Sequence, residues 1–224
     1  ATWIEPTGTI GDTVKLPPGQ YSDVRISPDR THAVFVRSIS MTEASLYLVD
    51  LAHFGGVPLS TGRGRNESPV WSPDSTHLVF ASDRDGPQDF FIKNVADASP
   101  EVPLYHSPVL FKKPDAWSSD NGWVVFTALA RDVTYDLWRL PIANWAASGP
   151  PVPYLVGPGK DYQGVPPPNR QWLAYVSSDT GSDELYVQSY PDPGRKQRIS
   201  TDGVWARWWS SDSRTLWFVS RDRT

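Results

Sequence analysis

The residues of this chain best suited to catalysis are three carboxylic acids, Asp23, Glu67 and Asp115. Each lies two to four residues before a large residue that opens a Ser-Pro-Asp or Ser-Ser-Asp turn. Three equivalent strands could therefore carry these side chains to one rim. Two carboxyl groups about 5 to 10 Å apart are the pair that hydrolyses glycosides. A carbohydrate-active enzyme is accordingly one alternative for this chain, with these acids as its catalytic residues.

Most other aspartates repeat at fixed positions of turns. Asp29, Asp74, Asp120 and Asp212 each end a Ser-Pro-Asp or Ser-Ser-Asp turn. An aspartate at such a position bonds to the backbone of its own turn, so turn formation explains it without a catalytic role. We therefore predict no catalytic residue in this chain, and a binding function rather than an enzymatic one.

The composition argues against metal, cofactor and nucleic-acid sites. The chain has no cysteine, and its four histidines include no pair with the spacing of a zinc site. His32 and His77 lie six residues after the large residue of their repeats, so we expect them in equivalent turns. No Gly-x-Ser-x-Gly motif supports a serine hydrolase. A net charge of −4 without a basic stripe disfavours nucleic acid as a partner. We expect no metal and no cofactor.

These residues belong to a repeat that must position them. A large residue before each Ser-Pro-Asp-type turn recurs 43 to 49 residues apart, and nine residues later each copy has an aromatic residue. We call the large residues anchors: Ile26, Trp71, Trp117, Pro166 and Trp209. The aromatic residues are Phe35, Phe80, Phe126, Tyr175 and Phe218. Each copy holds up to four short apolar segments in about 45 residues, which is the size of one β-propeller blade.

The last copy stops after two strands, and the missing two stand at the N-terminus. From Trp209 through the C-terminus and on from residue 1 to Ile26 there are 41 residues, close to the internal spacings. We predict an all-β fold, a five-bladed β-propeller of four-stranded blades, with the ring closed by a composite blade from both termini. Closure of this kind removes exposed sheet edges. A truncated six-bladed ring is the alternative. The predicted single domain spans 1–224, with blades at 21–60, 66–105, 113–156 and 162–200, and a last blade at 203–224 completed by 1–17.

The stretch Pro69–Phe91 resembles the repeat of TolB-like β-propellers, a relative of the WD-type repeats. It reads Trp-Ser-Pro-Asp, an apolar strand, Ser-Asp-Arg-Asp-Gly and an aromatic strand, with Ser75 where the family usually has Gly. The order of the whole chain is similar to the propellers that follow the kinase domain in bacterial eukaryotic-like serine/threonine protein kinases. The similar stretches are Trp3–Val14, Tyr21–Phe35, Ser68–Asp89 and Trp172–Tyr190. The resemblance implies a sensing or interaction module outside the membrane.

Ligands of propellers commonly bind at one end of the central channel, where the first strands of the blades begin. Side chains just before the anchors should line this mouth, and Trp205 and Trp208 are favoured among them. Because side chains alternate along a strand, Trp208 should face away from the core residue Trp209. The predicted ligand-binding residues are Tyr21, Asp23, Arg25, Glu67, Lys113, Asp115, Tyr162, Gln163, Trp205, Arg207 and Trp208. This mixture of aromatic and charged groups suits a protein, peptide or cell-envelope ligand.

We therefore expect a non-catalytic propeller that binds a ligand or a protein, as the sensor or scaffold of a larger bacterial protein. A membrane-anchored Ser/Thr kinase is the expected parent, with this domain outside the cytoplasm. No apolar run approaches the length of a membrane span. The sequence begins at Ala1 without Met, so we expect a processed chain or a part of a longer one. The alternatives are the propeller of a carbohydrate-active enzyme and a propeller associated with a peptidase.

Overall fold

The computed structural model describes residues 2–4, 9–60, 63–129 and 134–221. All regular structure in these residues is β-strand, as a chain with 11 Trp, 22 Pro and no long Ala/Leu/Glu/Lys stretches predicts. These residues contain no helix that could cross a membrane. The chain divides into two compact units, unit 1 with residues 1–106 and unit 2 with residues 107–224. Each unit is described by itself.

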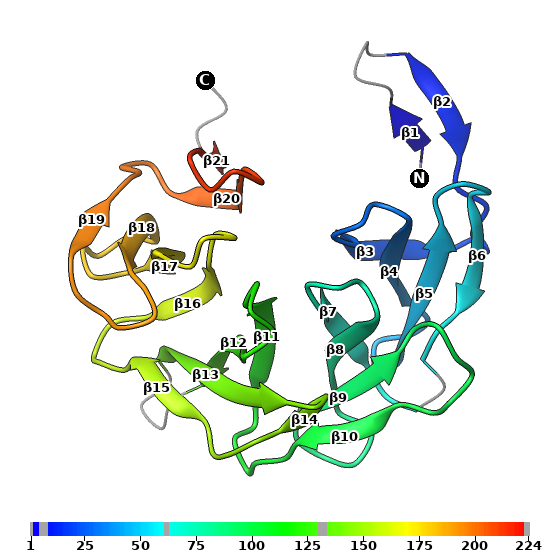
Figure 1. Ribbon diagram of the computed structural model, residues 1–224, viewed down its shortest axis with the longest axis horizontal. Helices are drawn as coiled ribbons and strands as arrows, with labels where there is room; N and C mark the ends of the chain where they lie inside the picture. The colour runs from blue at the N-terminus through cyan, green and yellow to red at the C-terminus, as the bar shows by residue number, and fades with distance from the viewer. Residues whose placement is uncertain (1, 5–8, 61–62, 130–133, 222–224) are drawn as a thin grey trace. The chain divides into compact units, whose positions relative to one another are not determined.

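Unit 1 contains a short hairpin and two four-stranded sheets (Figure 1). All neighbouring strands are antiparallel and follow one another in the chain, so each sheet is a simple meander. The hairpin pairs β1 (Thr2–Ile4) with β2 (Ile10–Thr13). The first sheet consists of β3 (Gln20–Ile26), β4 (His32–Ser38), β5 (Ala44–Asp50) and β6 (Gly55–Pro58). The second consists of β7 (Asn66–Trp71), β8 (His77–Ser82), β9 (Asp89–Asn94) and β10 (Val102–Tyr105).

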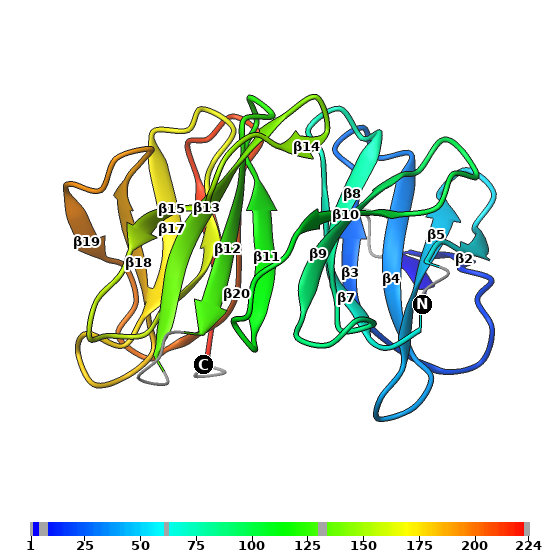
Figure 2. The same ribbon diagram turned by 90° about the horizontal axis from the view of Figure 1, so that it is seen from below.

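Unit 2 has the same kind of sheets, and Figure 2 shows β11, β12 and β13 running alongside one another. Its first sheet consists of β11 (Lys112–Trp117), β12 (Trp123–Leu129), β13 (Tyr135–Ala143), β14 (Ala146–Ala147) and β15 (Val152–Leu155). Its second consists of β16 (Asp161–Val165), β17 (Trp172–Ser177), β18 (Glu184–Ser189) and β19 (Lys196–Arg198). A last hairpin pairs β20 (Val204–Trp209) with β21 (Leu216–Ser220).

This strand content confirms the predicted all-β, five-bladed propeller. Four sheets of at least four strands account for four blades. The two terminal hairpins, β1–β2 and β20–β21, contain four further strands, which is the number in one blade. That they join into a composite blade and close the ring stays a prediction, as do the blade limits and the single domain.

The sheet of β11 to β15 has one strand more than predicted. Its third strand, β13, extends to Ala143, and the chain turns back through Asn144 and Trp145 into β14. Both turn residues have positive φ, 50° and 63°, as a two-residue type I′ hairpin requires. The ring of Trp145 packs edge-on against Trp117, with ring centroids 6.1 Å apart. The sequence did not predict this hairpin because no glycine marks its turn.

The aspartates of the repeated turns are structural, as predicted. In the first turn the Ser27 hydroxyl donates to Asp29 Oδ1 (2.6 Å), and the Thr31 N–H donates to the same oxygen (3.0 Å). Ser72 and Asp74 repeat the first of these bonds at 2.6 Å. The bond from Ser27 and the bond from the Thr31 backbone lower the pKa of Asp29 to about 2. These carboxylates therefore serve to close turns.

His32 and His77 occupy equivalent positions, as predicted, but each is the first residue of a strand, β4 or β8, and does not lie in the turn. The Nδ1 atom of each lies 2.7 Å from the hydroxyl of the preceding threonine. The fourth residue after each anchor has a left-handed backbone, with φ between 55° and 65°. At this position Ser75 replaces the glycine of the family repeat. Its hydroxyl accepts a hydrogen bond from the Asp29 N–H of the neighbouring sheet (3.0 Å), and Ser213 accepts one from Asn169 in the same way (2.9 Å).

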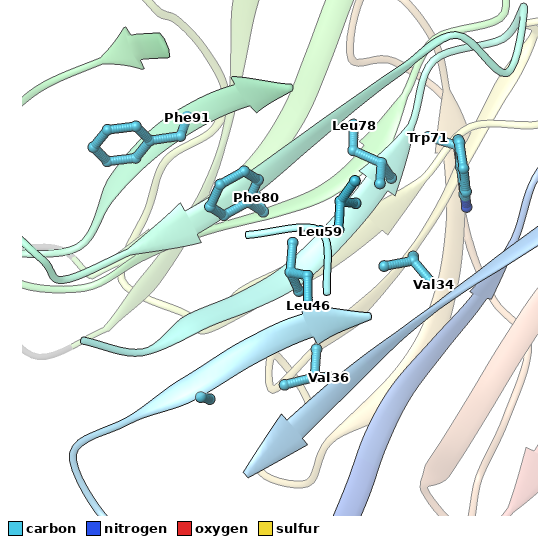
Figure 3. Packing of buried hydrophobic residues seen from close by; sticks show 9 residues of the cluster. Val34, Val36, Leu46, Leu59, Trp71, Leu78, Phe80 and Phe91 are labelled. Atoms are coloured by element: carbon cyan, nitrogen blue, oxygen red, sulfur yellow. The ribbon is translucent and has the colours of Figure 1, made fainter. Parts of the chain in front are cut away.

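Two of the anchors, Trp71 and Trp209, contact the preceding sheet of their own unit. Trp71 is 7% exposed and lies among buried aliphatic and aromatic side chains of unit 1 (Figure 3). Its indole N–H donates to the Arg25 carbonyl of the preceding sheet (3.0 Å), and Trp209 donates to Val165 in unit 2 (2.9 Å). Ile26 departs from the expected pattern, because half of its surface is exposed. Trp71 and Trp209 reach back to a preceding four-stranded sheet, whereas unit 1 has no four-stranded sheet before β3.

Candidate functional site

The predicted ligand-binding residues lie on or beside a β-bulge that recurs in the first strand of every sheet. The pairing register shifts within β3, β7, β11, β16 and β20, two to four residues before the anchor. In three of these strands a non-glycine residue has positive φ at the bulge: Asp23 (47°), Ser68 (54°) and Gln163 (57°). Bulges re-aim side chains and are common beside functional sites. The candidates lie along the first strands of the sheets, several of which end at the anchor, and the sequence did not reveal the bulges.

At the entrance of β3, Tyr21 is a packing residue. Its ring meets Phe35 and Tyr47 edge-on, with centroids 6.2 and 6.3 Å apart, and its hydroxyl donates to the Pro17 carbonyl (2.7 Å). Desolvation raises the pKa of the Tyr21 hydroxyl. The other two candidates of this strand pair with each other, with Asp23 Oδ1 and Arg25 Nη2 3.6 Å apart. Their polar groups are therefore engaged within β3.

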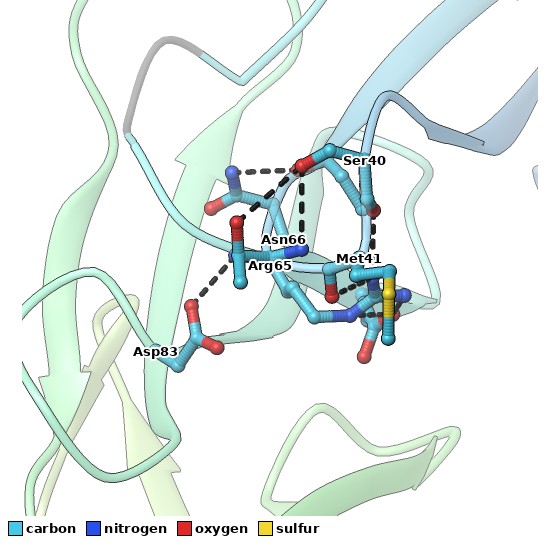
Figure 4. Close-up of polar contacts among 8 residues, drawn as sticks. Ser40, Met41, Arg65, Asn66 and Asp83 are labelled. Atoms are coloured by element: carbon cyan, nitrogen blue, oxygen red, sulfur yellow. Dashed lines mark hydrogen bonds and ion pairs between the residues drawn. The ribbon is translucent and has the colours of Figure 1, made fainter.

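Near the start of β7, Glu67 binds Arg65, and Arg65 contacts the loop after β4. Arg65 donates to Glu67 through Nε (2.8 Å) and through Nη2. The same guanidinium donates through Nη1 to the carbonyls of Ser40 (3.3 Å) and Met41 (3.0 Å), and the Arg65 N–H donates to Asp83 (2.6 Å) (Figure 4). The carboxylate of Glu67 thus orients an arginine that ties the loop after β4 to β7.

In unit 2 three of the candidates, Asp115, Gln163 and Arg207, belong to one hydrogen-bond network. Oδ2 of Asp115 accepts from the Thr127 hydroxyl (2.6 Å) and from the Gly164 N–H (3.3 Å). Thr127 Oγ1 in turn accepts from the Gln163 N–H (2.8 Å). Arg207 donates to the side-chain oxygen of Gln163 (3.1 Å) and to its carbonyl. The network therefore links the bulges of β11, β16 and β20.

Side chains of β12, β13 and β17 lie so close to position 164 that glycine is favoured there. A Cβ atom there would lie 3.0 Å from Val125, 3.1 Å from Leu173 and 3.3 Å from Leu137. Burial in this setting raises the pKa of Asp115 to about 6, although Lys113 and the bonds from Thr127 and Gly164 oppose the shift. The carboxyl group of Asp115 consequently changes its protonation near pH 6.

Beside this network lies a pocket of about 290 Å³. It is lined by Phe111, Lys113, Thr127, Tyr135, Lys160, Tyr162, Gln163 and Asp183. Three predicted residues, Lys113, Tyr162 and Gln163, thus line the same pocket. Two more are bonded to lining residues, since Arg207 donates to Gln163 and Asp115 accepts from Thr127. Their role in ligand binding stays a prediction. The other five lining residues were not predicted, because they come from second and third strands and from loops that carry no anchor.

Trp205 and Trp208 lie outside the pocket lining, on β20. They are 68% and 50% exposed, whereas Trp209 is partly buried and bonded to Val165. This difference agrees with the predicted alternation along the strand. The guanidinium of Arg221 lies over the Trp205 ring, 5.3 Å from its centroid.

The chemistry of the pocket suits binding. All four histidines of the chain lie in unit 1, so unit 2 has no imidazole base. Within the described residues no group of three His, Cys, Asp or Glu side chains could hold a metal ion. Asp183, the acid that lines the pocket, accepts a hydrogen bond from the Tyr162 hydroxyl, and its Oδ2 lies 3.4 Å from Arg221 Nη2. Burial and this neighbouring carboxylate raise the pKa of the Tyr162 hydroxyl to about 12. The pocket offers ammonium groups, aromatic faces and hydrogen-bond partners.

Comparison with known proteins supports the propeller architecture. No family model matches the chain. It is 29% identical over 111 residues to "Uncharacterized peptidase YuxL" of Bacillus subtilis, a match that covers 47% of this chain and 17% of that protein. Among solved structures, TolB from Acinetobacter baumannii superimposes with a TM-score of 0.81 at 16% identity, over 99% of this chain and 54% of that one. Putative TolB from Agrobacterium tumefaciens gives 0.68 at 17% identity, over 87% and 69%. This chain therefore has the fold of a TolB-like β-propeller.

Proposed function

We propose that this chain is a non-catalytic binding propeller of a larger bacterial protein, and that the pocket of unit 2 contacts a protein or peptide partner. The observation that carries the proposal is the origin of the pocket residues. The anchors and turn aspartates recur in equivalent copies, whereas Lys113, Tyr162 and Gln163 differ from copy to copy and converge on one pocket. Residues that differ between the copies of the repeat but line the same pocket are more simply explained by ligand binding than by a role in the fold.

A photo-cross-linker tests the site directly. We would replace Tyr135, on the pocket wall, by p-benzoylphenylalanine in the full-length parent protein and irradiate the source cells. Tyr105 of unit 1, also an aromatic residue partly buried beside another ring, is the matched control. We expect a discrete cross-linked partner from position 135 and none from position 105. The same adducts from both positions, or none from position 135, would contradict the proposed site.

The parent that we propose is a membrane-anchored Ser/Thr kinase, with this domain outside the cytoplasm as a sensor. The support is the order of repeats along the chain, which is similar to kinase-linked propellers. The parent reading frame tests it, because a kinase domain and a membrane span must precede this segment.

A peptidase-associated propeller is the second candidate, and the partial match to the Bacillus subtilis protein favours it. A hydrolase domain in the same reading frame would support this candidate over the kinase. A carbohydrate-active propeller is tested on the isolated chain with p-nitrophenyl glycosides. Turnover that is lost in Asp115→Asn would overturn the non-catalytic proposal.

A further inference from the structure

We propose that the unit 2 pocket recognises an acidic peptide segment of the partner, with a carboxylate between Lys113 and Lys160 and a neighbouring aromatic side chain against the tyrosines. The inference rests on the proposed binding function and names the chemistry of its ligand. It follows from the charge, the aromatic lining and the size of the pocket.

The charge of the pocket is positive. Two ammonium groups line it, and within the described residues neither Lys113 nor Lys160 donates a hydrogen bond or forms an ion pair through its side chain. The acid on the same wall, Asp183, is already bonded to Tyr162 and lies 3.4 Å from Arg221. Asp115 is not among the lining residues, and its carboxylate accepts hydrogen bonds from Thr127 and Gly164. A ligand carboxylate would thus meet two lysines that form no salt bridge within the described residues.

The other wall of the pocket is aromatic. Phe111 and Tyr135 meet edge-on at 5.7 Å, and Tyr135 and Tyr162 are tilted at 5.8 Å. Aromatic faces and edges of this kind favour contact with a further ring. The backbone groups of Gln163 are already bonded to Thr127 and Arg207, so the two ammonium groups are the charged donors of the pocket lining. An acidic group next to an aromatic ring matches both walls.

The volume limits the ligand to a short segment. Ligand pockets usually measure about 300 to 1,000 Å³, so this one is at the small end and accommodates one or two side chains of an extended peptide. Lysines bind carboxylates and phosphates as point charges, whereas bidentate phosphate recognition uses arginine. No arginine lines the pocket, and the chain carries a net charge of −4. These features favour a carboxylate over a polyanion.

The experiment measures the dissociation constants of three amidated dipeptide probes on the full 224-residue chain by NMR titration. The probes are acetyl-Phe-Glu-amide, acetyl-Phe-Gln-amide and acetyl-Ala-Glu-amide. We expect the first to bind most tightly, and Lys113→Ala and Lys160→Ala each to weaken it about two- to fivefold. The matched control is Lys15→Ala, since Lys15 is exposed on unit 1. Lys113→Arg should restore affinity because it restores the charge.

Three results would overturn this inference. They are equal binding of the Glu and Gln probes, equal losses in Lys113→Ala and Lys15→Ala, or tighter binding of inorganic phosphate than of the Glu probe. Each of these leaves the cross-link at position 135 unaffected, so the ligand chemistry can fail while the binding function stands. Failure of the cross-link with normal binding of the Glu probe would instead count against the proposed partner.

Discussion

The entrances of β7 and β16 share one backbone distortion and use it in different ways. Ser68 in β7 and Gln163 in β16 both have positive φ at the bulge. In β7 the preceding Glu67 is held by Arg65, which fastens a loop of unit 1. In β16 the preceding Tyr162 faces a pocket, and the arginine that meets the bulge, Arg207, comes from the next sheet. The repeat therefore determines the bulge, and the side chains beside it determine whether it closes a loop or lines a site.

The largest expected effect comes from the segment predicted to join the two ends of the chain. Replacing Thr2–Ile4 by Gly-Ser-Gly removes strand β1 but keeps the backbone bonds of Lys15 to Phe54 and Gly56. If β1–β2 completes the last blade, amide exchange in β20 and β21 should accelerate at least about tenfold, because their local stability falls. Hydrogen-exchange mass spectrometry measures this, with β7 to β9 as the internal reference. Unchanged exchange in β20–β21 would refute the composite blade.

The anchors of the two units should differ in their contribution to stability. Trp71→Ala removes a nearly buried side chain and should lower the free energy of unfolding by about 3–5 kcal/mol. Trp209→Ala removes a more exposed ring with the same type of indole bond and should cost less, about 1–3 kcal/mol. Urea denaturation measures both. A loss below about 1 kcal/mol for Trp71 would contradict its role as an anchor.

The sequence predicted the repeated parts of this molecule well. Trp71, Asp74 and His77 recur at fixed offsets, and the structure places their equivalents in the same turns and strands. It predicted the pocket only in part. Lys113 and Tyr162 stand just before anchors and were found by that position, whereas Tyr135 and Lys160 belong to segments without a repeated signal. Their convergence depends on the packing of β12, β13 and β16 against one another, which a one-dimensional pattern does not contain.

Asp115 and the pH dependence of folding provide the next test. Its pKa is raised to about 6 in the folded protein, above the value of 3.8 expected for the unfolded chain. The folded state thus holds the proton more tightly, so the stability from this group is present below about pH 4 and lost as the pH rises to about 6. Asp115→Asn resembles the protonated form. The variant should gain free energy of unfolding relative to the original protein between pH 4 and pH 7.

Urea denaturation of both proteins at pH 4 and pH 7 measures this difference in the free energy of unfolding. The other titrating groups contribute equally to both proteins, so their contributions cancel. Glu43→Gln is the control, since its side chain is exposed. The charged groups that face Asp115 are Lys113 and Arg207, and both variants leave them in place. A difference between Asp115→Asn and the original protein that does not change with pH would contradict the raised pKa.

The smallest effect is expected for Glu67, the counterpart of the pocket residues in β7. Its ion pair with Arg65 is partly exposed, so Glu67→Gln should cost at most about 1 kcal/mol, and less in high salt because the pair is then screened. The change should appear locally, as faster amide exchange at residues 39–42, because Arg65 would hold the Ser40 and Met41 carbonyls less firmly. Binding of acetyl-Phe-Glu-amide should stay the same, in contrast to Lys113→Ala. If Glu67→Gln weakened that binding as much as Lys113→Ala does, the two bulges would not have the separate roles inferred from their contacts.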